Sequence, residues 1–277
     1  MNLIVTGGEG FIGSKIVILA GASTYDLKSG KDILNTKQLS DACENVDGIF
    51  HCAAKITVSE SIQKPDEYYL HNVQGTASVI AVAEEKKRKI VFSSSAAVYG
   101  ESSHPVREDH VLNPQSPYAE NKRDGEALLK QSSIPSVILR YFNVYGPGQS
   151  PAYAGVITAF IQAALKGNDL VIHGDGEQVR DFVYVDDVAR ANILAMETEL
   201  KYGEVFNIAT GTRTSITELA TAVLRITHSS SKILYAPARP GDITYSQAET
   251  AKAKQLLGWE AQVGLEEGLE RTIKSFC

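Results

Sequence analysis

Three closely spaced glycines near the start of the chain constrain its fold more than any other feature. They follow a short apolar run, residues 2–6, in the spacing Gly8-x-Gly10-x-x-Gly13, and Gly7-x-x-Gly10-x-x-Gly13 fits as well. Residues 11–20 have a helical pattern. A strand, a glycine turn and a helix open a βαβ unit whose backbone can approach a pyrophosphate. We therefore expect a dinucleotide at the helix N-terminus, where N–H groups meet it, with an ordinary tight turn as the alternative.

Apolar runs and helical patterns alternate through the first half of the chain. Strands are expected at residues 48–52, 90–94 and 137–141, and helices at residues 38–43, 65–85 and 118–131. This alternation predicts an α/β fold of the Rossmann type, a doubly wound parallel sheet with helices on both faces.

The regular alternation of strand and helix patterns ends after Tyr145-Gly146-Pro147-Gly148, and the second half has a different order of elements. Helices are expected at residues 155–166, 215–225 and 265–276, and strands at residues 169–173, 182–185 and 205–208. We assign residues 1–150 to the dinucleotide-binding domain, with residues 180–210 returning to it. Residues 151–179 and 211–277 are expected to form a smaller, discontinuous α/β lobe that binds the substrate.

Composition narrows the classes of partner. The formal net charge of the 277 residues is −6, whereas a nucleic acid or a membrane surface would favour a basic face, so we expect neither partner. The basic run at residues 86–89 is interpreted as a solvated helix end. Since no apolar run approaches ~20 residues, we expect no membrane span, no signal peptide and a cytoplasmic location.

The cysteines, Cys43, Cys52 and Cys277, are odd in number and far apart, so we expect neither a disulfide framework nor a metal site. Cys52 lies in an apolar strand and is interpreted as a small buried hydrophobe.

Asp26 follows the expected second strand, residues 23–25. A carboxylate there can accept hydrogen bonds from ribose hydroxyls and repel a 2′-phosphate, which favours NAD over NADP. Its distance from Gly13 is shorter than the usual ~20 residues. Lys28 could favour the phosphate, although a surface lysine is the plainer interpretation.

Tyr118 and Lys122 lie one helical turn apart, and Ser95 follows an apolar strand at the edge where such sheets bind ligands. A phenol ionises near pH ~10, so we expect the Lys122 ammonium and a nicotinamide ring to lower the pKa of Tyr118. Ser95 could hydrogen-bond the reacting oxygen. A solvated pair on a helix surface is the alternative for Tyr118 and Lys122.

Over nearly its whole length the chain resembles the extended short-chain dehydrogenase/reductase family. Within it, the chain is most similar to NAD-dependent nucleotide-sugar epimerases of the UDP-glucose 4-epimerase type. The matching segments are Thr6-Gly7-Gly8-x-Gly10-Phe11-Ile12-Gly13, Asp32-Ile33, His51-Cys52-Ala53-Ala54, Asn72-Val73-x-Gly75-Thr76, Ser93-Ser94-Ser95-Ala96-Ala97-Val98-Tyr99-Gly100, Tyr118-x-x-x-Lys122, Arg140-Tyr141-Phe142-Asn143-Val144-Tyr145-Gly146-Pro147, Gly174-Asp175-Gly176-x-Gln178-x-Arg180-Asp181-Phe182 and Arg239-Pro240-Gly241-Asp242.

The resemblance implies a role for each matching position. The catalytic residues would be Ser95, Tyr118 and Lys122. The NAD contacts would be Gly7, Gly10, Phe11, Ile12, Gly13, Asp26, Lys28, Asp32, Ile33, Cys52, Ala53, Ala54, Asn72, Ser93, Tyr118, Lys122 and Tyr141. The UDP-sugar contacts would be Ser95, Ala96, Tyr118, Asn143, Val171, His173, Arg180, Arg239, Asp242 and Ser246. For the two arginines a surface ion pair is the alternative, and for His173 a plain surface histidine.

Two departures from the family pattern concern the cofactor. The intervals from Gly13 to Asp26 and from Asp26 to Asp32 are short, so the usual helix and strand there must be trimmed or absent. The counterpart of the family's pyrophosphate lysine is Lys55, shifted by one position.

The resemblance implies epimerisation of a UDP-hexose at C4 through a transient 4-keto sugar, by a cytoplasmic homodimer of carbohydrate metabolism. Sugar dehydratases carry Asp-Glu after the catalytic Ser or Thr, and Ala96 and Ala97 stand there instead. An NAD(P)H-dependent 4-keto-sugar reductase and a non-catalytic NAD-sensing scaffold are the alternatives. Ser246 falls where a small residue admits N-acetyl sugars, so UDP-glucose/UDP-galactose and UDP-N-acetylglucosamine are expected substrates, unless a slip of one residue places Tyr245 there.

Overall fold

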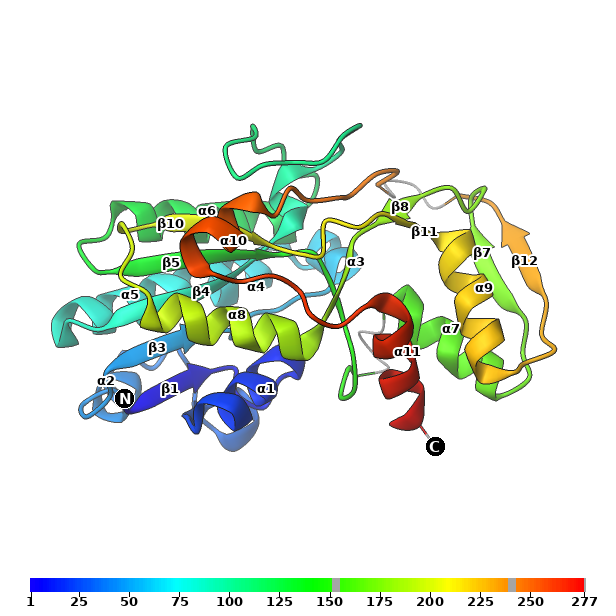
Figure 1. Cartoon of the computed structure of the whole chain (residues 1–277). Coiled ribbons are helices and arrows are strands. Elements are labelled where there is room, and N and C mark those ends of the chain that lie inside the picture. Colours follow the sequence, from blue (N-terminus) through cyan, green and yellow to red (C-terminus); the bar gives the residue numbers. More distant parts are fainter. Residues whose placement is uncertain (151–154, 239–242, 277) are drawn as a thin grey trace.

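The computed structural model describes residues 1–150, 155–238 and 243–276. Its centre is a six-stranded parallel sheet with the strand order β2-β1-β3-β4-β5-β10 (Figure 1). The strands are β1 (Leu3–Thr6), β2 (Ser23–Tyr25), β3 (Gly48–His51), β4 (Lys89–Ser95), β5 (Ser136–Tyr141) and β10 (Glu204–Ile208). The predicted doubly wound parallel sheet is confirmed; residues 204–208 form its edge strand, whereas residues 182–184 pair with residues 143–145 outside it.

Helices cover both faces of this sheet, because its strands are apolar on both sides. In β1, Leu3 and Val5 face one core cluster and Ile4 faces the other. The first cluster is closed by α1 (Phe11–Ala20), α8 (Val185–Glu197) and α10 (Ala251–Leu257). The second is closed by α2 (Thr36–Ala42), α5 (Gly75–Lys86) and α6 (Pro117–Gln131).

The expected helix at residues 65–85 is composite. It consists of α4 (Pro65–Tyr69), a turn of π-helix called η2 (Leu70–Gln74), and α5. A short helix before it, α3 (Val58–Gln63), was not expected. The expected helix at residues 118–131 is confirmed as α6, whose first position is Pro117 and whose Ser116 side chain accepts the Ala119 N–H.

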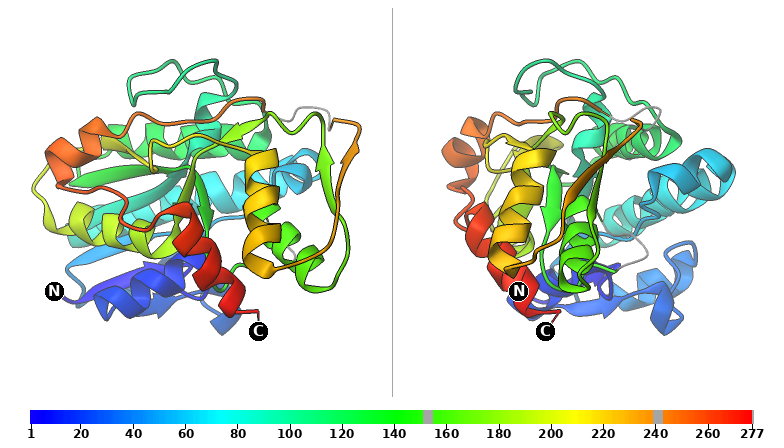
Figure 2. Two further views of the ribbon diagram at one scale, coloured as in Figure 1. Left: turned by 45° about the vertical axis from the view of Figure 1, so that its right-hand side comes forward. Right: turned by 90° about the vertical axis from the view of Figure 1, so that its right-hand side faces the viewer.

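A smaller unit with its own core lies beside the sheet (Figure 2). It contains α7 (Val156–Leu165), α9 (Ile216–Thr227), α11 (Leu265–Lys274) and the parallel pair β7 (Leu170–His173) with β12 (Ile233–Ala236). Two further pairs are β6 (Asn143–Tyr145) with β9 (Phe182–Tyr184), and β8 (Val179–Arg180) with β11 (Thr214–Ser215). None of the helices within the described ranges is long and apolar enough for crossing a membrane.

The C-terminal part of the chain does not belong wholly to the smaller unit. Ala253, Leu257 and Trp259 pack into the core cluster under β1, β4 and β5, and the Trp259 indole N–H donates to the Asp187 carbonyl at 2.9 Å. This part of residues 211–277 therefore lies against the large domain, although the sequence placed it in the lobe.

A buried ion pair fastens α6 to the sheet. Arg140 on β5 and Glu126 on α6 are each about 1% exposed. Arg140 Nε and Nη2 donate to the two Glu126 oxygens at 2.9 and 2.6 Å, and the Ser94 hydroxyl donates to the same carboxylate at 2.6 Å. Arg140 Nη1 also donates to the Tyr99 hydroxyl at 2.8 Å. Forked, charge-assisted bonds of this kind are among the strong ones, and each charge offsets the burial of the other.

Replacement of Glu126 by Leu should leave the Arg140 guanidinium buried without its carboxylate. We expect a loss of ~3–5 kcal/mol in the free energy of unfolding, measured by chemical denaturation. The matched control is Glu120→Leu on the exposed side of α6, which should change stability little. Adding Arg140→Met to Glu126→Leu should recover most of the loss, and no recovery would contradict the pairing.

Candidate active site

The glycine turn between β1 and α1 is packed too closely for side chains. Gly7 has φ +72°, and a Cβ there would lie 2.7 Å from the Ala53 nitrogen. A Cβ on Gly13 would lie 2.1 Å from the Gly7 carbonyl oxygen. The turn brings the N-terminus of α1, with Phe11 and Ile12 in its first turn, to the carboxyl edge of the sheet. Between β1 and β3 the strand order reverses, which is where such sheets bind dinucleotides.

Asp26 is buried beside this turn. Its carboxylate accepts the Glu9 N–H and the Lys28 N–H, both at 2.9 Å, and Lys28 Nζ donates to the Glu9 carbonyl at 2.9 Å. A carboxylate has about four acceptor positions, so it retains capacity for ligand hydroxyls. Asp26 and Lys28 therefore both lie at the glycine turn, and their contact with NAD stays a prediction.

The shortened region after Asp26 folds as a single 3₁₀ turn, η1 (Leu27–Ser29), capped by the Asp26 side chain. Asp32 caps the next turn by accepting the Leu34 N–H at 2.9 Å, and Ile33 is buried in the second core cluster. The predicted trimming is thus accommodated by side-chain caps in place of a longer strand and helix.

The exit from β3 is fixed by Asn72. Its side chain accepts the Lys55 N–H at 2.8 Å and donates to the Lys55 carbonyl at 2.9 Å, which pins the stretch that contains Cys52, Ala53 and Ala54. Lys55 Nζ lies 2.6 Å from Glu67, and this partner raises the pKa of the lysine. Asn72 therefore acts in this structure by holding the backbone beside the cofactor region.

His51, at the end of β3, is a polar residue whose role the sequence did not predict. Its Nδ1 lies 2.7 Å from the Thr6 hydroxyl, and its Nε2 lies 2.9 Å from the Thr76 hydroxyl. Because the Thr76 hydroxyl donates to the Asn72 carbonyl at 2.6 Å, it accepts from Nε2. Burial lowers the pKa of His51 to about 3, so the ring is neutral and ties β1 and β3 to the helix of Thr76.

Ser95, Tyr118 and Lys122 come together at the carboxyl edge of β4. Lys122 is buried, and its Nζ donates to the Ser93 carbonyl at 2.7 Å. Burial lowers the pKa of Lys122 to about 8. Burial raises the pKa of Tyr118, and a hydrogen bond with Ser95 acts in the opposite direction.

The groups of the protein itself therefore raise the Tyr118 pKa, and the expected lowering, which included a nicotinamide ring, stays a prediction for the site with NAD bound. Desolvation is the largest influence on the phenol, and the ammonium of Lys122 is directed at a backbone carbonyl. A group that stabilises the phenolate has to act on Tyr118 after the ligands bind.

Below this group lies a buried polar chain. The Ser93 hydroxyl donates to Cys52 Sγ at 3.2 Å and lies 3.1 Å from the Tyr141 hydroxyl, which donates to the Asn192 side chain at 2.9 Å. Burial raises the pKa of Tyr141 far above its usual range. Asn192, on α8, was not predicted, because a single asparagine in a helix gives no sequence signal.

The expected UDP-sugar contacts come from both units. Asn143 on β6 donates to the Asp181 carbonyl at 3.1 Å, and Arg180 on β8 donates to the Val179 carbonyl at 2.9 Å. Val171 on β7 is 46% exposed, and His173 Nδ1 lies 3.2 Å from the Pro237 carbonyl.

Ser246 donates its N–H to the Val179 carbonyl at 3.0 Å, next to Arg180. Ala96 begins the 3₁₀ turn η3 (Ala96–Tyr99) directly after Ser95. Arg239 and Asp242 lie outside the described residues.

Asp181 is a further residue that the sequence did not single out. Its buried carboxylate accepts the Thr210 N–H and hydroxyl at 2.8 and 2.7 Å, and the Gly211 N–H at 2.9 Å. It thereby fixes the position of Arg180. Within residues 1–150, 155–238 and 243–276 no group of His, Cys, Asp or Glu could hold a metal ion.

Comparison with known proteins agrees with this geometry. A putative UDP-glucose 4-epimerase of Methanocaldococcus jannaschii is 37% identical over 98% of this chain and 97% of its own length. The crystal structure of Thermotoga maritima UDP-glucose 4-epimerase with UDP-glucose superposes with a TM-score of 0.92 at 36% identity, covering 100% of this chain and 98% of that one.

Methanobrevibacter ruminantium UDP-N-acetylglucosamine 4-epimerase, solved with UDP-N-acetylmuramic acid, has a TM-score of 0.93 at 36% identity, covering 99% and 97% of the two chains. Residues 3–209 also match the family model described as the NAD dependent epimerase/dehydratase family. The glycine turn, the sheet order and these similarities over the full chain lead to one assignment: the protein belongs to the NAD dependent epimerase/dehydratase family.

Proposed function

We propose that the protein is an NAD-dependent UDP-sugar 4-epimerase, which interconverts hexoses such as those of UDP-glucose and UDP-galactose. The observation that carries the proposal is the meeting of Ser95, Tyr118 and Lys122 beside the glycine turn. Similarity to 4-epimerases over nearly the whole chain supports the same reaction. Ala96 and Ala97 carry no acid or base, so elimination of water has no support here.

The residues at the turn fit a dinucleotide. Gly7 and Gly13 allow the tight turn that brings the N-terminus of α1 to the edge of the sheet, where a pyrophosphate would bind, and Asp26 provides a buried carboxylate for the ribose hydroxyls. Lys28 Nζ donates to the Glu9 carbonyl on the same side of the turn, and the preference for NAD over NADP rests on the Asp26 carboxylate, which would repel a 2′-phosphate. NAD, when bound, supplies a reversible hydride acceptor for C4 of the sugar.

In the proposed mechanism Tyr118 removes the proton of the sugar 4-hydroxyl and later returns it. Ser95 hydrogen-bonds that oxygen and relays the proton, since it already interacts with the phenol. Lys122, with a pKa of about 8, is charged at neutral pH and can stabilise the phenolate when the site is assembled.

The UDP part of the substrate would stay bound while the 4-keto sugar rotates and presents its other face. Arg180 and Arg239 would bind the diphosphate together with Asn143, and Val171 and His173 would lie against the uracil. Remote binding energy of this kind keeps the intermediate in place without contacting the reacting carbon. The domain division into a cofactor unit and a sugar unit remains part of this proposal.

The proposal is tested with purified protein and UDP-glucose without added NAD. We expect UDP-galactose to form, because no net oxidation occurs and the cofactor should stay bound.

Tyr118→Phe keeps the ring and removes the hydroxyl, so we expect kcat to fall ~10²–10⁴-fold with little change in UDP binding. Stoichiometric consumption of added NADPH would favour a 4-keto-sugar reductase instead.

The segment around Ser246 bears on which UDP-sugars the protein accepts as substrates. Tyr245 lines a cleft on the side of residues 101–110, and its hydroxyl bonds to the Gln247 side chain. Ser246 donates its N–H to the Val179 carbonyl next to Arg180, and we take Ser246 as the residue that faces the sugar. A small side chain at this position would leave room for an N-acetyl group.

We therefore expect the wild-type protein to epimerise both UDP-glucose and UDP-N-acetylglucosamine. Ser246→Tyr should abolish turnover of the N-acetyl sugar and retain that of UDP-glucose, because the added ring overlaps only the larger substituent. Steady-state assays with both substrates measure this, with Ser246→Ala as the control. Loss of both activities in Ser246→Tyr alone would contradict the steric explanation.

We also propose that two copies pair through the apolar surface of α3, α4 and η2, where Ile62 is 64% exposed and Tyr69 47%. Exposed apolar patches of this kind mark interaction sites. Sedimentation should give twice the chain mass of 30.0 kDa, and Ile62→Glu should shift it towards the single mass. An unchanged mass for wild type and variant, at 30.0 kDa, would overturn the dimer.

The cytoplasmic location stays part of the proposal.

A further inference from the structure

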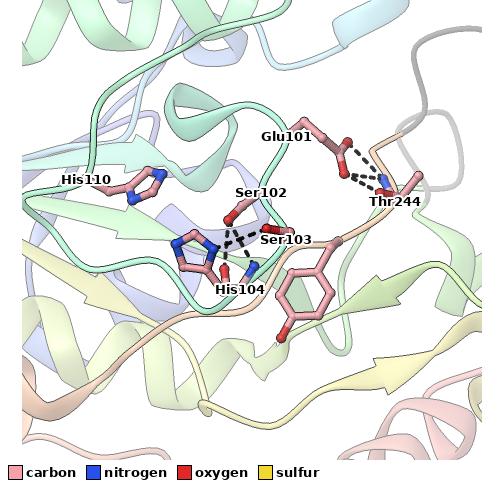
Figure 3. A pocket seen from close by; sticks show the side chains of 7 residues that line it. Glu101, Ser102, Ser103, His104, His110 and Thr244 are labelled. Atoms are coloured by element: carbon pink, nitrogen blue, oxygen red, sulfur yellow. Dashed lines mark hydrogen bonds between the residues drawn. The ribbon is translucent and has the colours of Figure 1, made fainter.

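A side-chain tether joins the loop after the catalytic strand to the segment that precedes Ser246 (Figure 3). The Glu101 carboxylate accepts the Thr244 N–H at 3.0 Å and 3.2 Å, and it also accepts the Thr244 hydroxyl. The two residues are 143 positions apart. One anion thus holds both hydrogen-bond donors of a distant residue.

The loop end of the tether is firmly placed. Glu101 follows η3, the turn that begins next to Ser95, and Gly100 has φ +72°. A Cβ on Gly100 would lie 2.1 Å from the Asn113 carbonyl oxygen, and the Asn113 N–H donates to the Val98 carbonyl at 3.0 Å. The backbone that carries Glu101 is therefore set relative to the strand that ends in Ser95.

The other end of the tether lies in a segment shared by both units. On the side of the smaller unit, Val179 donates to the Thr244 carbonyl at 2.9 Å and accepts the Ser246 N–H at 3.0 Å. On the side of the large domain, Val106 donates to the Gln247 carbonyl at 2.9 Å. Glu101 adds a charged contact to that side at Thr244, two residues before Ser246.

This tether also borders the open cleft, about 470 Å³ in volume, that is lined by Glu101, Ser102, Ser103, His104, His110, Thr244 and Tyr245. Solvent reaches one side of the 244–246 segment through this cleft. Water competes for exposed hydrogen bonds, so an ionised acceptor holds the segment better than a neutral one would.

We propose that Glu101 is a positioning residue for sugar recognition. It acts through Thr244 and fixes how far Ser246 stands from Ser95. The proposal rests on the proposed function, because it takes Ser246 as a wall of the sugar pocket. Glu101 would influence how well the sugar fits in the ground state and not the proton transfer by Tyr118.

The test compares Glu101→Ala and Glu101→Gln with the wild type. We expect KM for UDP-glucose to rise ~10-fold in Glu101→Ala, with kcat unchanged within about a factor of two and an intermediate KM for Glu101→Gln. Binding of UDP alone, measured by calorimetry, should change little. The matched control is Asp109→Ala, which removes the same charge from an exposed ion pair with Arg107 on the same loop.

A second measurement separates this inference from the proposed function. Hydrogen exchange at the amides of residues 243–249 should accelerate in Glu101→Ala and stay as in wild type in Asp109→Ala. Thr244→Val should add little to the effect of Glu101→Ala, since both remove one interaction. Unchanged KM and unchanged exchange in Glu101→Ala overturn the tether, as does a fall in kcat alone. If the wild type has no epimerase activity, the proposed function fails, and the exchange data still decide whether the tether exists.

Discussion

The buried pair of Glu126 and Arg140 is the interaction on which the geometry of the site depends. Glu126 lies on the same face of α6 as Lys122 and Tyr118, at successive intervals of one turn. Its carboxylate is bonded to Arg140 on β5 and to Ser94 on β4, directly before Ser95. One anion therefore sets the helix that carries the phenol and the ammonium against the strand that carries the serine hydroxyl.

The pair illustrates how the interior combines polar and apolar contacts. The sheet strands are buried on both faces by aliphatic and aromatic side chains, which stabilise the fold. A few satisfied polar groups add fixed contacts, such as His51 between Thr6 and Thr76, or Asn72 around Lys55. Each would be costly to leave without partners, so each admits few alternative arrangements.

The parallel sheet, the glycine turn and the trio Ser95, Tyr118 and Lys122 could be predicted from the sequence because their signals are local. Apolar runs mark strands, glycines mark close approach, and a four-residue spacing marks one helix face. The roles of Asp181, Asn192 and Glu101 could not be predicted, since their partners lie far away in the chain. The burial that raises the pKa of Tyr118 in the absence of NAD has no local signal either, because it depends on how distant elements close over the phenol.

Trp259 gives the molecule a built-in optical reporter. It is the single tryptophan of the sequence and is fully buried in the core of the large domain, with its indole N–H bonded to the Asp187 carbonyl. The smaller unit, by contrast, has a core that contains tyrosine and phenylalanine among its aliphatic residues. Intrinsic tryptophan emission should therefore change when the sheet domain unfolds or when the segment around Trp259 leaves it. Opening of the smaller unit alone should leave that emission largely unaltered.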